Sequence, residues 1–147
     1  MNWFITALAL AFPQGMSGEK TTLSFEGLSV KGERFLWNGS DLEVTGHVLV
    51  DYEDFQIQSQ TLTLQLNEER QILSASLAGQ VVLKRGSWRG VANRVQWKKG
   101  ESWISMLGSA RLVDTQWEFQ GERISFSVDT DQIECLNDCS IRAKPNP

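Results

Sequence analysis

One three-residue phrase recurs four times along the chain, and it constrains the fold more than any other feature. The four versions start 27, 33 and 29 residues apart, and they read Gly32-Glu33-Arg34, Ser59-Gln60-Thr61, Ala92-Asn93-Arg94 and Gly121-Glu122-Arg123. Each is flanked by apolar residues at alternate positions, which is the period of a strand with one buried face. An internal repeat of this length indicates stacked copies of one supersecondary unit.

The apolar positions change parity at these phrases. In the second copy they include Phe55 and Ile57 before the phrase, and Leu62 and Leu64 after it. A straight strand would turn its apolar face outward after such a step, so a bend or bulge must lie there. We therefore interpret the first residue of each phrase, which is Gly, Ser or Ala, as a corner of the sheet and not as a ligand site.

Each copy closes with a second alternating run, which passes through Gly46, Gly79, Gly108 or Asn137. Polar segments typical of hairpin turns join the runs: "NGSD", "NEERQ", "KKGES" and "DTDQ". The sequence thus predicts an all-β fold of about four repeated, bent β-hairpin units around one apolar interior, formed by two facing sheets or by one folded-over sheet. Such a stack leaves unpaired strand edges at both ends, and we expect them to pair with a partner.

The first segment of this 147-residue chain differs from the rest. An apolar run from Trp3 to Phe12, followed by Pro13 and small residues, is about half as long as a membrane-spanning helix but matches the core of a signal peptide. We predict a signal peptide over residues 1–18 and one domain over residues 19–147. The alternative is that the run forms an apolar first turn or strand of the domain.

Two longer phrases show the repeat most clearly: "LAGQVVLKRGSWRGVANRVQW" from Leu77 to Trp97 and "MLGSARLVDTQWEFQGERISF" from Met106 to Phe126. In both, a glycine-containing alternation leads through a short polar turn to a strand that begins at the small residue. This pattern resembles the OstA/LptA-like domain of lipopolysaccharide-transport proteins, over nearly everything after residue 20. The resemblance implies a folded-over antiparallel β-jellyroll whose apolar interior shelters the lipid A acyl chains of lipopolysaccharide in the periplasm.

The same resemblance implies partners and a location. It implies that the protein is exported to the periplasm, is not an enzyme and needs no cofactor. The protein would form a bridge that joins inner-membrane and outer-membrane transport proteins through its edge strands, and it could also associate with itself head to tail. A net charge of −4 also argues against nucleic acid as a partner. Two other classes compete with this function: a structural β-repeat protein that polymerises by its edges without lipid cargo, and a carbohydrate-binding β-sandwich with several exposed Trp residues.

Acyl chains need a dry trough walled by long inward apolar runs. The residues that we expect to contact lipid are Val48, Val50, Leu64, Val81, Leu83, Trp97, Ile104, Met106, Leu112 and Phe126. The competing interpretation is that these side chains pack against one another as a closed core.

A basic stretch between Val82 and Gly100 carries six Lys or Arg residues and no acid. Four of these are candidates to contact lipid phosphates at the rim of the groove: Arg85, Arg89, Arg94 and Lys98. The sequence favours the alternative, a solvated face whose cations pair with acids of neighbouring strands.

The remaining chemistry-bearing residues give weaker signals. His47, the single histidine, has no partners at metal-ligand or catalytic spacing, so we assign it no metal or catalytic role. Cys135 and Cys139 would lie roughly 13 Å apart in an extended strand, too far for a disulfide unless the chain bends at Asn137-Asp138. The favoured interpretation is a pair of small buried thiols, with the disulfide as the alternative.

Overall fold

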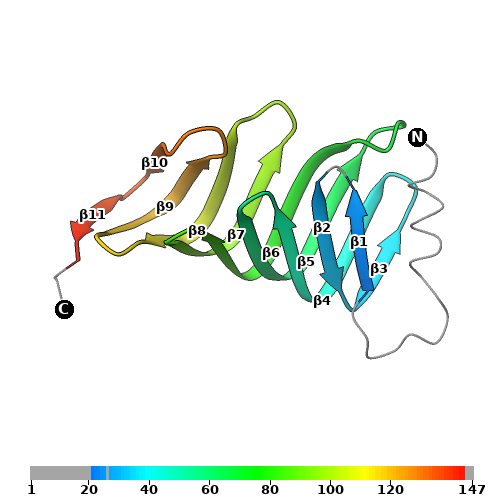
Figure 1. Ribbon diagram of the computed structural model, residues 1–147, viewed down its shortest axis with the longest axis horizontal. Coiled ribbons are helices and arrows are strands. Elements are labelled where there is room, and N and C mark those ends of the chain that lie inside the picture. Colours follow the sequence, from blue (N-terminus) through cyan, green and yellow to red (C-terminus); the bar gives the residue numbers. More distant parts are fainter. Residues whose placement is uncertain (1–20, 26, 145–147) are drawn as a thin grey trace.

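The computed structural model describes residues 21–25 and 27–144, and every one of these residues that has regular structure lies in a strand of one antiparallel sheet (Figure 1). The strands are β1 (Thr21–Phe25), β2 (Leu28–Gly32), β3 (Arg34–Trp37), β4 (Asp41–Tyr52), β5 (Phe55–Leu66), β6 (Ile72–Arg85), β7 (Trp88–Lys98), β8 (Trp103–Val113), β9 (Trp117–Ser127), β10 (Ile133–Leu136) and β11 (Ser140–Ala143). The all-β fold class is confirmed. No helix able to span a membrane occurs in this part of the chain. The predicted signal peptide, residues 1–18, lies outside the described residues.

The pairing of the strands follows the four repeats. The sheet runs in the order β1-β2-β4-β5-β6-β7-β8-β9-β10, while β3 also pairs with β4 and β11 with β9. The first unit is the bent pair β2 and β3 with β4, the second is β5 with β6, the third is β7 with β8, and the fourth is β9 with β10 and β11. The predicted four bent hairpins are therefore confirmed, and β1 adds one strand beside β2.

The predicted corners are β-bulges. Thr45 pairs with Thr61 and Val48 with Ser59, so Gly46 and His47 together face the single residue Gln60. Gly46 and His47 both have positive φ, 85° and 48°, which bends the strand sharply. The same left-handed pair recurs as Gly79-Gln80 and Gly108-Ser109. The extra residue thus belongs to the closing strand of each unit, opposite the three-residue phrase.

In the first three units, the second residue of the phrase covers the glycine of the closing strand. The side chain of Glu33 lies against Gly46, that of Gln60 against Gly79, and that of Asn93 against Gly108. A β-carbon on Gly79 would lie 2.5 Å from Oε1 of Gln60, so a glycine is required there by both space and backbone conformation. The corners therefore form one continuous column along the fold.

The bends fold the sheet into two layers that face each other. Layer A contains β2, β11 and residues 48–52, 55–59, 81–85, 88–92, 110–113 and 117–121; layer B contains β3, β10 and residues 41–45, 61–66, 72–78, 94–98, 103–107 and 123–127. The column of corners is the spine where the layers join. The hairpin turns lie at the opposite ends of the strands, and we call the opening between the turns of layer A and those of layer B the mouth.

The apolar faces of both layers meet in one hydrophobic cluster. Parity behaves as predicted in β5, where Phe55, Ile57 and Ser59 are buried before the corner and Leu62 and Leu64 after it. Ser59, the small residue of its phrase, donates its hydroxyl hydrogen to the Thr61 carbonyl at 2.8 Å and so bridges its own bend. The interior is therefore built from alternate residues of every long strand.

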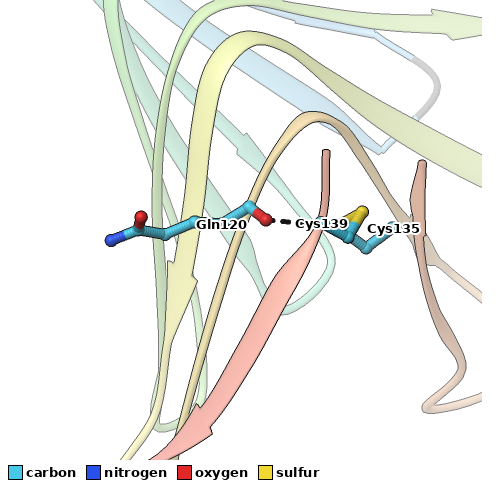
Figure 2. The surroundings of a disulfide bond; sticks show 3 residues. All are labelled: Gln120, Cys135 and Cys139. Carbon is cyan, nitrogen blue, oxygen red and sulfur yellow. Dashed lines mark hydrogen bonds between the residues drawn. A yellow bond between two sulfur atoms is a disulfide. The ribbon is translucent and has the colours of Figure 1, made fainter. Parts of the chain in front are cut away.

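The fourth corner corrects the interpretation of the cysteines. Cys135 and Cys139 form a disulfide, with their Cα atoms 5.9 Å apart (Figure 2). Asn137 and Asp138 have φ of 66° and 56°, the left-handed pair that the other units make with a glycine, and this bend shortens the distance enough for the bridge. Neither cysteine is fully buried. The favoured prediction of two buried thiols was wrong, because it treated the segment as straight.

Candidate functional site

An apolar cavity of about 110 Å³ separates the two layers in the half of the fold nearer to the N-terminal strands. Layer A lines it with Leu28, Val50, Tyr52, Phe55 and Ile57; the other side consists of Leu62, Leu64, Ile72, Ala75, Leu77, Val95, Trp97, Ile104 and Val128. All of these side chains except those of Tyr52 and Trp97 are hydrocarbon. Trp97 donates its indole N–H to the Glu101 carbonyl at 3.1 Å, so its polar atom is bonded to the turn after β7.

The ten residues predicted to contact lipid divide into two groups. Val50, Leu64, Trp97 and Ile104 line the cavity. The other six are fully buried in the close-packed part of the interior: Val48, Val81, Leu83, Met106, Leu112 and Phe126. A role in lipid contact remains a prediction for all ten.

Ten of the lining residues were not among those predicted from the sequence to contact lipid. Several of them lie beside hairpin turns, such as Tyr52 and Phe55 on either side of one turn, Ile72 after another and Val128 before a third. An apolar residue adjacent to a turn on the inner face is the signal that could have identified them.

Arg85 lies at the mouth and is fully engaged there. Its Nε donates to Oδ2 of Asp54 at 3.0 Å, Nη1 donates to the Ser127 carbonyl at 2.8 Å, and Nη2 donates to the Val128 carbonyl at 3.4 Å. Its guanidinium carbon also lies 4.7 Å from the ring centre of Phe55 and 5.2 Å from that of Phe126. Arg85 therefore joins the end of β6 in layer A to the end of β9 in layer B.

The structure does not bring the four predicted phosphate-contacting residues together. Arg89, Arg94 and Lys98 are exposed and alternate with the inward residues of β7, so they lie on its outer side. None of the three forms an ion pair with another described residue. The alternative of cations paired with acids of neighbouring strands applies to Arg85, whose partner Asp54 lies in the turn between β4 and β5. Contact with phosphate remains a prediction.

A second charged cluster holds the last strand to the sheet. Glu118 of β9 is buried, and it accepts hydrogen bonds from Nε of Arg111 at 3.0 Å, Nε2 of Gln120 at 2.7 Å and Nη2 of Arg142 at 3.3 Å. The hydrogen bond from Arg111, with further ones from Gln120 and Arg142, outweighs desolvation and lowers the pKa of Glu118 to about 2. Because Arg142 belongs to β11, this carboxylate helps to fix β11 against β9.

The disulfide lies at the inner side of the spine in the fourth unit. The Sγ of Cys135 is 3.5 Å from the Gln120 carbonyl oxygen, the contact drawn as a dashed line in Figure 2. A disulfide sulfur carries no hydrogen, so this is a packing contact. The disulfide spans the bend of a strand pair that has a neighbour on one side only, since β10 and β11 both pair with β9 and with no other described strand.

Comparison with known proteins agrees with this architecture. No match was found among the curated proteins. Among solved structures, the chain is similar to the crystal structure of LptH, "the LptA homologous periplasmic component of the conserved lipopolysaccharide transport device from Pseudomonas aeruginosa", with a TM-score of 0.71 and 11% identity over 80% of this chain and 95% of that one. This similarity confirms the fold. Residues 36–132, about two thirds of the chain, match the family model described as "LptA/(LptD N-terminal domain) LPS transport protein". The resemblance noted from the sequence is therefore confirmed: the chain belongs to the LptA/(LptD N-terminal domain) family of lipopolysaccharide-transport proteins.

Proposed function

We propose that this protein carries lipopolysaccharide through the periplasm as a bridge between inner-membrane and outer-membrane transport proteins, with the lipid A acyl chains held between its two layers. The observation that supports this most directly is the cavity between the layers, whose lining is almost entirely hydrocarbon. Burial of apolar surface is the main driving force for sheltering an acyl chain from water. The role requires binding and release, and no chemical step.

The size of the cavity indicates how the lipid enters. An apolar cavity of about 150 Å³ accommodates one benzene molecule. The cavity here, at about 110 Å³, has room for a short piece of one acyl chain. The layers must therefore move apart at the mouth when lipid binds.

Within the described residues, the outermost strands have no partner on one side, which suits the proposed partners. Layer A ends with β1 on one side and β11 on the other, and layer B ends with β3 and β10. At the C-terminal end the apolar inner face continues to exposed residues, including Trp117 at 44% and Ile141 at 56% exposed. We propose that transport proteins, or further copies of this chain, add strands at these edges and extend the apolar interior.

Site-specific photocrosslinking tests the cargo. A photoreactive phenylalanine derivative at Trp97, on the cavity wall, is expected to crosslink to lipopolysaccharide added to the purified protein. The matched control has the same derivative at Val91, which is exposed on the outer side of the neighbouring half of β7. Equal lipid capture at the two positions, or none at Trp97, would contradict an interior lipid site. Determining the mature N-terminus of the exported protein tests the proposed location and the signal peptide.

A further inference from the structure

The contacts of Arg85 define a closed point of the mouth. We use the term Arg85 latch for Arg85, Asp54, Phe55, Phe126 and the carbonyls of Ser127 and Val128. The rings of Phe55 in layer A and Phe126 in layer B meet edge to face with centres 5.9 Å apart. At this point the two layers touch through both an aromatic contact and a guanidinium group.

The latch forms one wall of the cavity. Phe55 and Val128 belong to the latch and also line the cavity. Beyond the latch, Phe126 contacts Trp88 at 6.1 Å between ring centres, and Trp88 contacts Phe119 at 5.8 Å. This aromatic series leads toward the C-terminal end of the fold, where the inner face is exposed. The latch therefore separates the cavity from the rest of the apolar interior.

The two sides of the Arg85 ion pair are in different environments. The Arg85 side chain is 15% exposed and lies over two aromatic rings, whereas the Asp54 side chain is 60% exposed. Asp54 is easily rehydrated if it leaves, but a guanidinium left between two layers without an anion is costly. Asp54 and Arg85 both lie on the side of layer A, so opening of the latch removes from Arg85 the Ser127 and Val128 carbonyls and not Asp54. An incoming anionic group can replace these carbonyls, and the exposed Asp54 as well, whereas an uncharged ligand that opens the latch leaves Nη1 and Nη2 of Arg85 without their acceptors.

We propose that the Arg85 latch is an anion-responsive gate of the interior, which selects acyl lipids that carry a phosphate group. The phosphate takes the place of the two carbonyls and of the Asp54 carboxylate on Arg85, and the parting of Phe55 from Phe126 joins the cavity to the C-terminal half of the interior. Arg85 thereby couples recognition of a charged headgroup to the space that the acyl chains need. This inference rests on the proposed function, since it assumes that acyl chains occupy the space between the layers.

The test compares three probes on the purified protein: a short-chain phosphatidic acid, the diacylglycerol with the same acyl chains, and inorganic phosphate. Spin labels on Gln56→Cys in β5 and Thr130→Cys in the turn after β9 report the separation of the layers across the mouth. We expect phosphatidic acid to lengthen this distance and to bind about tenfold more tightly than the diacylglycerol, the ratio that one charge-assisted hydrogen bond supplies. Inorganic phosphate should leave the distance unchanged, because it has no chain to fill the opened interior.

Variants of the latch separate its role from general charge. Arg85→Gln is expected to bind phosphatidic acid and the diacylglycerol with nearly equal affinity. The control is Arg34→Gln, which should keep the tighter binding of phosphatidic acid, because Arg34 is an exposed residue of β3 and forms no ion pair with a described residue. Asp54→Asn leaves Arg85 in place without its competing carboxylate, so it should bind phosphatidic acid more tightly than the wild type. This second variant changes an exposed side chain and keeps the test decisive if Arg85→Gln does not fold.

The outcomes distinguish the two levels of the proposal. Equal preference for phosphatidic acid in the wild type and in Arg85→Gln, or opening by inorganic phosphate alone, would overturn the gate. Binding of both lipids with an unchanged label distance would also overturn it, while leaving the lipid-carrying interior intact. If the wild type binds neither lipid, the proposed function itself fails.

Discussion

The Sγ atom of Cys135 occupies the space beside Gly121, where it lies 2.7 Å from the position that a β-carbon on that glycine would take. The Sγ of Cys139 is 3.0 Å from the same position. Gly121 is the small residue of the fourth phrase, and its missing side chain accommodates the disulfide. The glycine in this phrase and the two cysteines on either side of the Asn137-Asp138 corner are thus parts of one packing arrangement.

Gly121→Ala should therefore destabilise the fourth corner by about 1–3 kcal/mol, the usual cost of overpacking a tight site. Thermal or urea unfolding followed by circular dichroism measures this. In a Cys135→Ala/Cys139→Ala background, the sulfur atoms are gone and the same substitution should cost much less. Equal costs in the two backgrounds would show that Gly121 and the disulfide are energetically independent.

Reduction of the disulfide should loosen the C-terminal edge. Closing so short a loop stabilises the fold by about 2 kcal/mol if the effect is purely chain entropy. We expect a reductant to accelerate amide hydrogen exchange in β10 and β11 while β5 and β6, far from the bridge, remain protected. The Cys135→Ala/Cys139→Ala variant should exchange rapidly with or without reductant, and slow exchange in that variant would refute a structural role for the bridge.

Substitution of the corner glycines should separate backbone strain from crowding. Gly79 and Gly100 have nearly equal φ, 87° and 85°, but only Gly79 has a neighbour, the Gln60 side chain, where a β-carbon would lie. An alanine at φ near 85° costs about 1 kcal/mol or more at either position. Gly79→Ala should cost a further 1 kcal/mol or so from crowding, which Gln60→Ala would relieve. The free energies of unfolding of Gly79→Ala, Gly100→Ala, Gln60→Ala and the double variant Gln60→Ala/Gly79→Ala provide the comparison. Equal losses at Gly79 and Gly100 would count against the packing of Gln60 on its corner.

Glu118 should make the attachment of β11 sensitive to acid. Its folded-state pKa is lowered from 4.5 to about 2, so its stabilising contribution is complete above about pH 4.5 and is lost as the pH falls through about 2. Exchange of the β11 amides, or proteolysis of the C-terminal segment by pepsin, should increase across this window. Glu118→Gln should release β11 already at neutral pH and remove this part of the pH dependence, whereas Glu134→Gln, an exposed position on β10, should not.

Filling the cavity should reduce lipid binding without unfolding the protein. Ala75 lines the cavity, so Ala75→Leu has space for its added carbons and is expected to leave stability unchanged or slightly higher. Binding of an acyl-chain fluorophore should fall severalfold. Ala92 is buried and does not line the cavity, so Ala92→Leu should cost about 1–3 kcal/mol. Undiminished binding by Ala75→Leu would mean that the fluorophore occupies another site.

The repeat and its corners could be predicted from the sequence because they depend on local features. Alternation fixes which residues face inward, and a Gly or Asn in the closing run marks the left-handed bend. The predicted inner face was wrong at the start of β6, where the strand pairing has a second register shift in addition to the corner. The alternation through Leu73, Ala75 and Leu77 predicts Leu73 on the inner face, but the register shifts beside Leu66, so Ile72 is buried and Leu73 is exposed.

The candidate site was less accessible to prediction because it depends on how far the layers separate. Alternation shows that Leu64 and Leu83 both face inward, but not that one borders a cavity while the other is closely packed. The role of Arg85 depends on a turn more than 40 residues away, whose carbonyls reach the guanidinium only after the sheet has folded over. The disulfide required two consecutive left-handed residues, Asn137 and Asp138, in a segment whose pattern resembles a continuous strand.

The bend in every long strand has a consequence for growth of the sheet. At the C-terminal end, β10 and β11 present two short edges that lie in different layers and meet at the Asn137-Asp138 corner. A straight incoming strand can hydrogen-bond to one of these edges only, and it would leave the other layer unfinished. A strand that completes both layers must itself turn opposite that corner. The shape of the edge therefore excludes ordinary β-strands from full pairing and admits those built on the same repeat.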